Sequence, residues 1–261
     1  NIGVQMTQFR EITSGLRFPE GPIAMPDGSV ILVEIERQTL TRVLPDGSQE
    51  IIAKTGGGPN GAAMGPDGKC YICNNGGFNW GTDDGILHTI GASDDYVTGS
   101  IQRVDLETGE IETLYTECDG NRLCGPNDIV FDKAGNFWFT DLGKARPRDL
   151  DRGAVYYARS DGSLIVEAIH PLFMPNGIGL SPDDGRVYAA ETDAARLVAW
   201  DIVGEGEVAK KPWPAVGWGD LIMAPEGNVR FDSLALEANG NICVATLMTG
   251  GITVAAPSGG I

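Results

Sequence analysis

Five side chains that carry a carboxylate or amide oxygen recur at a fixed distance ahead of a turn glycine. The pairs are Glu20 with Gly28, Asn60 with Gly68, Asn127 with Gly135, Asn176 with Gly185, and Asp232 with Gly240. The spacing is 8 residues in four pairs and 9 in the pair that ends at Gly185, where the turn has one extra residue. When copies of one unit surround an axis, the same position of each copy points to the same place. The pattern therefore predicts oxygen ligands that meet around one bound cation.

The types of oxygen predict which cation would bind. Glu20 and Asp232 supply two negative charges, whereas the three asparagines supply neutral amide oxygens. Sites made only of oxygen select hard ions. We therefore expect Ca²⁺ first and Mg²⁺ or Mn²⁺ next, with Zn²⁺ as the least suited alternative. The competing interpretation is that asparagines and prolines repeat here because turns favour them. It explains the asparagines, but it leaves two acidic side chains in a channel without a partner.

The elements that must position these oxygens are β-strands. After each turn glycine comes a short run rich in β-branched and aromatic residues, at positions 29–34, 69–74, 136–141, 186–192 and 241–246. Such runs next to Asp-Gly or Asn-Gly turns predict hairpins. Further strand pairs are predicted at 41–44 with 49–53 and at 154–158 with 164–167, which gives about four strands per repeat. Helical periodicity is missing over any convincing length, so the predicted fold class is all-β.

The repeat length predicts the architecture. The steps between successive turn glycines are 40, 67, 50 and 55 residues, close to the roughly 40–50 residues of a propeller blade. We predict a single β-propeller domain over residues 1–261, with six blades and the last blade incomplete. A strand at 8–13 is expected to close that blade, and roughly 35–45 further residues are expected after Ile261. A ring of five blades is the alternative.

Composition narrows the class of partner. The chain has 19 basic and 36 acidic residues and a formal net charge of −17, which argues against nucleic acid or an anionic membrane surface. The sequence has no stretch long and apolar enough to span a membrane, and residues 1–10 do not resemble a signal peptide. We expect a cytoplasmic protein that acts on a small molecule, and the sequence leaves the oligomeric state open.

The five cysteines do not indicate a metal or redox centre. Cys70 and Cys73 lie three residues apart on a predicted strand, so their side chains face opposite sides and cannot easily bind one ion. Cys118 and Cys124 flank a loop and could form a disulfide, but free thiols are expected in a cytoplasmic chain.

Histidine-based catalysis is poorly supported. The chain has only His88 and His170, and His170 is expected to be an ordinary loop residue. A Ser-His-Asp triad is therefore not expected. The available chemistry is metal-assisted hydrolysis, in which a cation polarises a carbonyl and a carboxylate activates water.

Several motifs resemble one protein family. They are Phe18-Pro19-Glu20-Gly21-Pro22, Gly125-Pro126-Asn127-Asp128, the run 175–183 that begins Pro175-Asn176-Gly177, and the late Asp232. Together they are similar to the gluconolactonase/regucalcin (senescence marker protein) family over nearly the whole chain. The resemblance implies a six-bladed propeller with one divalent metal in its central channel and lactone-hydrolysing activity. The paraoxonase and diisopropyl-fluorophosphatase enzymes are similar more distantly.

The resemblance also implies the site residues. The metal ligands would be Glu20, Asn127, Asn176 and Asp232, and the catalytic residues would be Asp232, as base, and Asn127. A metal-held Asp232 is expected to share the role of base with Asp128, and Asn60 and Asp128 are expected to contact the substrate. This chain departs from the family in two places: Gly125 replaces an arginine common in sugar-lactone members, and Phe231-Asp232-Ser233 replaces a common Pro-Asp-Gly. These departures leave the lactone unspecified.

One repeat contains an insertion. The 67-residue step exceeds a normal blade by about 20 residues, and the excess falls within residues 74–100. We expect this segment to wall the pocket. Phe78 and Trp80, together with Met174 and Met248 near the channel mouth, are the expected substrate contacts. Their apolar character favours a less polar ligand than an aldonolactone. The alternatives are a plain surface loop or an oligomer contact.

A non-catalytic propeller is the competing function class. Propellers host many unrelated functions, so the cation could be structural and the loops could bind a ligand or a protein. A cation that keeps open positions towards a pocket would favour catalysis, whereas one surrounded fully by protein would favour the structural role.

Overall fold

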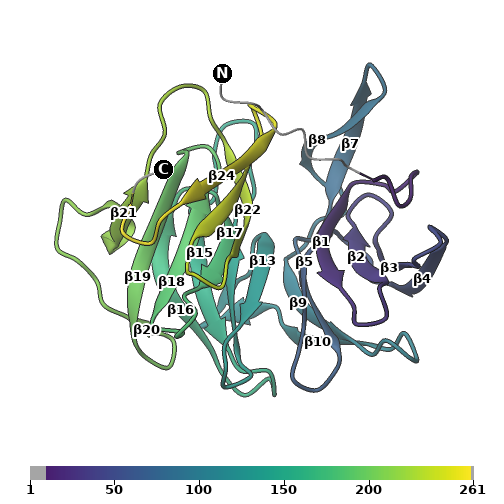
Figure 1. The fold of residues 1–261 in the computed structure, drawn as a ribbon, viewed down its shortest axis with the longest axis horizontal. Helices are drawn as coiled ribbons and strands as arrows, with labels where there is room; N and C mark the ends of the chain where they lie inside the picture. Colours follow the sequence, from purple (N-terminus) through teal and green to yellow (C-terminus); the bar gives the residue numbers. More distant parts are fainter. Residues whose placement is uncertain (1–9, 260–261) are drawn as a thin grey trace.

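The computed structural model describes residues 10–259, whose main strands form five antiparallel sheets that lie next to one another as blades (Figure 1). The innermost strands follow one another in space: β1 (Pro19–Ala24) contacts β5 (Pro59–Met64), which contacts β13 (Pro126–Phe131), then β17 (Pro175–Leu180) and β22 (Phe231–Leu236). The only helical element among these residues is the short 3-10 turn η1 (Val216–Trp218). Within the same range, no helix has the length and apolarity needed to cross a membrane.

The first two blades are four-stranded. Blade 1 has β1, β2 (Val30–Glu34), β3 (Thr39–Val43) and β4 (Gln49–Lys54). Blade 2 has β5, β6 (Cys70–Asn74), β9 (Ser100–Val104) and β10 (Ile111–Tyr115). Between β6 and β9 lies a hairpin of β7 (Phe78–Asp83) and β8 (Ile86–Ala92), which pair only with each other. This hairpin occupies the predicted insertion and projects beyond the blades in Figure 1.

The other three blades vary more. A small hairpin of β11 (Glu117–Cys118) and β12 (Asn121–Arg122) precedes blade 3, which has β13, β14 (Phe137–Asp141), β15 (Gly153–Ala158) and β16 (Ile165–Leu172). Blade 4 has β17, β18 (Arg186–Glu191) and β19 (Arg196–Gly204), with β20 (Glu207–Val208) and β21 (Asp220–Met223) both paired to β19. Blade 5 has β22, β23 (Ile242–Thr246) and β24 (Gly251–Ala255).

Apolar side chains form the core between successive blades. Cys70 packs with Ile31 and Val33 between blades 1 and 2, whereas Cys73 packs with Phe139 between blades 2 and 3. The prediction that these two cysteines face opposite sides of the sheet is therefore confirmed. All five cysteines are free, so the alternative of a disulfide between Cys118 and Cys124 is wrong.

The turn after each inner strand contains one residue with positive φ. In four blades it is the predicted glycine, namely Gly28, Gly68, Gly135 and Gly240, with φ between 74 and 90°. In blade 4 it is Asp184 (φ 57°), and Gly185 is the extra residue that follows. The left-handed residue thus comes 8 positions after the polar residue in all five blades. The spacing from the polar residue to the left-handed residue is therefore constant, whereas the spacing to the glycine is not.

The part of the chain that the structure describes forms five blades rather than the six predicted for the complete propeller. The strand predicted at 8–13 lies partly outside the described residues, and residues 10–13 are not in a strand. The reason is that this segment binds the outer turn of blade 1. Thr13 Oγ1 donates a hydrogen bond to the carbonyl of Gly47 at 2.8 Å, and Gln49 Nε2 donates to Thr13 Oγ1 at 2.8 Å.

Candidate functional site

The five predicted oxygen residues lie at the same irregularity of the five inner strands. In each inner strand the antiparallel register shifts near its start, between Glu20 and Ile23, Pro59 and Ala62, Pro126 and Ile129, Pro175 and Ile178, and Phe231 and Leu234. A bulge of this kind bends a strand and redirects its side chains. The polar residue of each blade lies at the edge of this bulge or inside it, so all five share one local geometry.

The residue that precedes each inner strand is held by the same backbone hydrogen bond in every blade. The N–H that follows the second strand donates to its carbonyl: Ile35 to Phe18, Asn75 to Gly58, Leu142 to Gly125, Thr192 to Met174, and Leu247 to Arg230, at 2.8–3.0 Å. We call these five acceptors the mouth residues. Each lies two positions before a predicted channel oxygen, so the bond fixes the backbone that leads into the site.

Buried polar side chains at the ends of the second strands hold the backbone at, or directly before, four of the mouth residues. They accept backbone N–H groups as follows: Glu34 from Arg17 (2.6 Å), Asn74 from Gly58 (2.8 Å), Asp141 from Cys124 and Gly125 (2.7 Å each), and Glu191 from Phe173 (2.6 Å). All four side chains are buried. Sequence reasoning missed them. The available signal was a carboxylate or amide that ends a mostly apolar strand in four of the five repeats.

Glycines beside the channel residues let the inner strands approach closely. A Cβ on Gly61 would lie 2.4 Å from the carbonyl oxygen of Asn127, and one on Gly177 would lie 2.7 Å from that of Asp232. Real side chains do not tolerate such distances, so only glycine fits there. The close approach brings the polar residues of neighbouring blades side by side.

Three carboxylates of the inner strands, those of Glu20, Asp128 and Asp232, lie near enough to affect ionisation within the group. Burial, followed by the nearby carboxylates of Asp232 and Asp128, raises the pKa of Glu20 to about 7. Burial likewise raises the pKa of Asp128 to about 7, and Asp232 contributes. The pKa of Asp232 is raised by burial, although the Asn176 side chain lowers it in part. Desolvation and like charges both disfavour ionisation, and a cation bound here would favour the ionised form of these carboxyl groups.

The amides next to these carboxylates fit a cation site. The side-chain oxygen of Asn176 is buried and has no hydrogen-bond partner, and Asn127 is also buried. A buried acceptor without a donor is unfavourable, and coordination to a cation would satisfy it. Over residues 10–259 no group of three or more His, Cys, Asp or Glu side chains is arranged to hold a metal. A cation site here would therefore need these amides in addition to Glu20 and Asp232.

A cavity of about 430 Å³ adjoins this cluster. Its lining includes Gly21, Asp128 and Ser233 from the inner strands and Cys243, Ala245 and Ile252 from blade 5. The Asp128 side chain is thus placed both beside the other carboxylates and against a space large enough for a small ligand. None of the four predicted apolar contacts lines this cavity.

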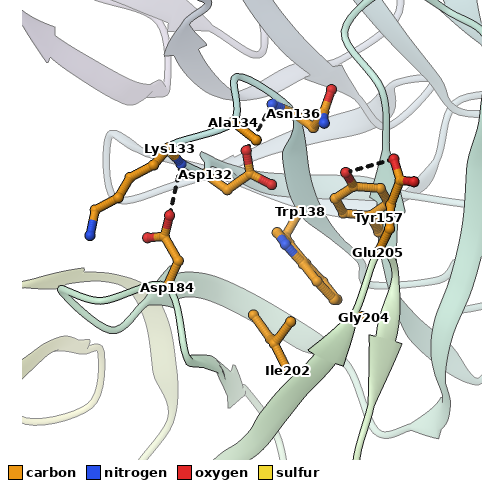
Figure 2. A pocket seen from close by; sticks show the side chains of 10 residues that line it. All are labelled: Asp132, Lys133, Ala134, Asn136, Trp138, Tyr157, Asp184, Ile202, Gly204 and Glu205. Atoms are coloured by element: carbon orange, nitrogen blue, oxygen red, sulfur yellow. Dashed lines mark hydrogen bonds between the residues drawn. The ribbon is translucent and has the colours of Figure 1, made fainter.

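Another cavity lies between the turns of blades 3 and 4 and is separate from the channel. Its volume is about 450 Å³, and Figure 2 shows Trp138 and Tyr157 in its wall, with the Tyr157 hydroxyl donating a hydrogen bond to Glu205. It contains none of the predicted site residues. Trp138 and Tyr157 are almost completely buried, so the aromatic surface available to a ligand is small.

The predicted apolar contacts are distributed around the mouth. Trp80 of the insertion packs against Phe18, the mouth residue of blade 1, with ring centroids 5.0 Å apart. Phe78 packs against Trp80 at 6.2 Å. Met174 is itself the mouth residue of blade 4, whereas Met248 is exposed in the turn between β23 and β24.

Both histidines lie outside the channel cluster. His88 is on β8 of the projecting hairpin, 3.5 Å from Asp83. His170 is on β16, 3.9 Å from Glu167. Neither lines the cavity next to Asp128.

Comparison with known proteins gives matches along most of the chain. The model of the SMP-30/Gluconolactonase/LRE-like region matches residues 18–261. Gluconolactonase from Zymomonas mobilis is 27% identical over 216 residues, which cover 74% of this chain and 54% of that protein. Lactonase drp35 from Staphylococcus saprophyticus is 29% identical over 181 residues, which cover 69% and 49%. This chain thus spans about half the length of these curated relatives.

A solved structure shows the same fold. The calcium-binding protein regucalcin from Agrobacterium tumefaciens superposes with a TM-score of 0.69 at 20% identity, covering 95% of this chain and 73% of that one. At this identity the similarity concerns the fold alone, which agrees with the predicted propeller class.

Proposed function

The chain belongs to the SMP-30/gluconolactonase/LRE-like family, and on this premise we propose that it is a divalent-metal-dependent lactonase. Its active site would be the channel that contains Glu20, Asn127, Asn176 and Asp232. The observation that carries the proposal is a cluster of half-buried carboxylates beside a buried amide oxygen that has no donor. Relatives named gluconolactonase and lactonase support the class of reaction.

Ca²⁺ is the cation that suits this donor set best. Two carboxylates and two amides give only hard oxygen ligands, and Ca²⁺ accepts about six to eight of these in a flexible geometry. If the protein supplied fewer ligands than that, coordination positions would remain for the substrate and water. The calcium-binding regucalcin with the same fold supports this choice. Mg²⁺ and Mn²⁺ are the alternatives, because they share the preference for oxygen.

The residues of this chain would divide the reaction between them. A bound cation would supply a Lewis acid for the lactone carbonyl. Asp232 would accept a proton from the attacking water, and Asp128 beside it would share that proton. The pKa of Asp128, about 7 through burial, suits a group that exchanges protons at neutral pH. Asn127 would orient the carbonyl group, and the cavity next to Asp128 would hold the ring.

The test is hydrolysis of a panel of γ- and δ-lactones before and after chelation. We expect turnover to disappear with chelator and to return with Ca²⁺. Glu20→Gln should weaken cation binding by about 10²-fold or more, because it removes one of two charged ligands. The matched control is Glu50→Gln, which changes an exposed glutamate on β4 and should leave binding unchanged.

Two outcomes would overturn parts of this proposal. Turnover that survives complete chelation would exclude the metal-dependent mechanism. A protein that binds Ca²⁺ but hydrolyses no lactone in the panel would instead support a propeller with a structural cation and a binding role.

A further inference from the structure

Lys144 is a buried lysine that the proposed chemistry does not use. It lies in the loop between β14 and β15, is 2% exposed, and makes no ion pair within the described residues. Its ammonium donates hydrogen bonds to the carbonyl of Gly77 at 3.0 Å and to Asn75 Oδ1 at 3.3 Å. Burial lowers the pKa of Lys144 to about 8, so placing a charge here is unfavourable. Net stability therefore does not explain why a lysine occupies this position.

Two aromatic rings of the insertion flank this ammonium. The centroid of Phe78 is 4.0 Å from Lys144 Nζ, and that of Tyr96 is 5.0 Å away. Cations are attracted to ring faces at such distances, more strongly when they are desolvated. Phe78 begins β7, whereas Tyr96 lies in the segment that returns from β8 to blade 2. A side chain from blade 3 therefore contacts both halves of the insertion.

The two halves of the insertion reach different parts of the channel mouth. The first half contacts Phe18, two positions before Glu20, through Trp80. The second half contacts the segment that leads into Asn127: the Tyr96 hydroxyl donates to the carbonyl of Cys124 at 2.7 Å. The insertion thus spans the mouth from blade 1 to blade 3, with Lys144 between its halves.

We propose that Lys144 is a positioning residue that fixes the insertion over the channel mouth and so makes the channel select lactones with an apolar substituent. The selectivity part rests on the proposed function. A buried charge adds little net stability compared with an apolar side chain of similar size, but its fixed acceptors can specify one arrangement. Here two acceptors and two ring faces specify where Phe78, and Trp80 beside it, lie. A substituent that extends from the lactone ring towards Trp80 would meet this wall.

Lys144→Met isolates the charge. Methionine keeps an apolar chain between the two rings but removes the charge and the donors. Both acceptors keep a partner, because Gly77 O still accepts the N–H of Ser93 at 3.2 Å and Asn75 Oδ1 still accepts the N–H of Gly77 at 2.8 Å. The variant should therefore fold. The matched control is Lys54→Met, which changes an exposed lysine on β4.

The first measurement is amide hydrogen exchange of the chelated, substrate-free protein. We expect Lys144→Met to accelerate exchange across residues 76–99 by about fivefold to tenfold, with other segments and the melting temperature nearly unchanged. Phe78→Leu should accelerate exchange in the same segment. Adding Lys144→Met to it should have little further effect, because both changes break the same contact.

The second measurement is kinetic. In Lys144→Met, KM for a lactone with an apolar substituent should rise by about threefold to tenfold with kcat within about twofold, while an unsubstituted lactone is unaffected. Unchanged exchange over residues 76–99 would overturn the positioning role. Faster exchange with unchanged selectivity would overturn the link to substrate choice. A wild-type protein without lactonase activity would overturn the proposed function, and the exchange result would still decide the role of Lys144.

Discussion

The ring of Trp80 packs against the ring of Phe18 with centroids 5.0 Å apart and planes inclined by 55°. Trp80 belongs to the insertion of blade 2, whereas Phe18 has a positive φ of 55° and leads directly into Pro19 and Glu20 of blade 1. Because the insertion touches the backbone that carries a predicted ligand, a substituent that extends from a substrate in the channel towards the mouth would meet it.

Trp80→Ala should change selectivity among lactones. Removing the indole should lower kcat/KM for lactones with apolar substituents by roughly the 1–3 kcal/mol of a lost hydrophobic contact, and should affect small unsubstituted lactones far less. Trp213→Ala, which removes an exposed indole that is 83% accessible, is the control. A uniform loss for all lactones together with a lower melting temperature would assign Trp80 a purely structural role.

The stability of the metal-free protein should fall as the pH rises towards neutrality. The pKa of Glu20 is raised from 4.5 to about 7 by burial and by Asp232 and Asp128, so the folded state binds more protons than the unfolded chain between these values. The stabilisation is complete below about pH 4.5 and is lost as the pH rises through about 7, by about 3 kcal/mol for this group. Urea unfolding with chelator should show this slope.

Two further samples test that prediction. Glu20→Gln should reduce the slope, because the amide does not titrate, and Ca²⁺ at about pH 8 should restore the stability of the wild type. Identical slopes for wild type and variant would contradict the assignment of Glu20.

Gly177→Ala should disturb the channel through the backbone. The new Cβ would lie 2.5 Å from the backbone nitrogen of Leu234 and 2.7 Å from the carbonyl oxygen of Asp232, so β22 must move away from β17. We expect a loss of stability of about 1–3 kcal/mol and weaker cation binding, measured by calorimetry. The control is Gly251→Ala, where a Cβ meets no atom within 4 Å. Unchanged cation binding in Gly177→Ala would argue against Asp232 as a ligand.

His88→Ala and His170→Ala should each keep substantial turnover on the best lactone. Both histidines lie away from the carboxylate cluster and its cavity. Loss of a general base typically lowers the rate by about 10²–10⁴-fold. A decrease of that size in either variant would transfer the role of base to that histidine.

Local chemistry allowed the repeat to be predicted from sequence. A turn that needs one residue with positive φ, followed by a strand of β-branched and aromatic residues, is specified within about ten residues. The rule holds even in blade 4, where Asp184 replaces glycine at the left-handed position. For the same reason the opposite orientations of Cys70 and Cys73 followed from the two-residue period of a strand.

The tertiary structure decided which distant segments meet. Residues 10–13 are not a strand because their partner is the outer turn at Gly47, and the number of blades cannot be read from local patterns. Nothing near Lys144 in the sequence indicates that its ammonium reaches Gly77, 67 positions away. Likewise Asp128 gains its raised pKa from burial against other blades. Such properties depend on how the blades face one another, because burial and through-space charge are set by packing between segments far apart in the chain.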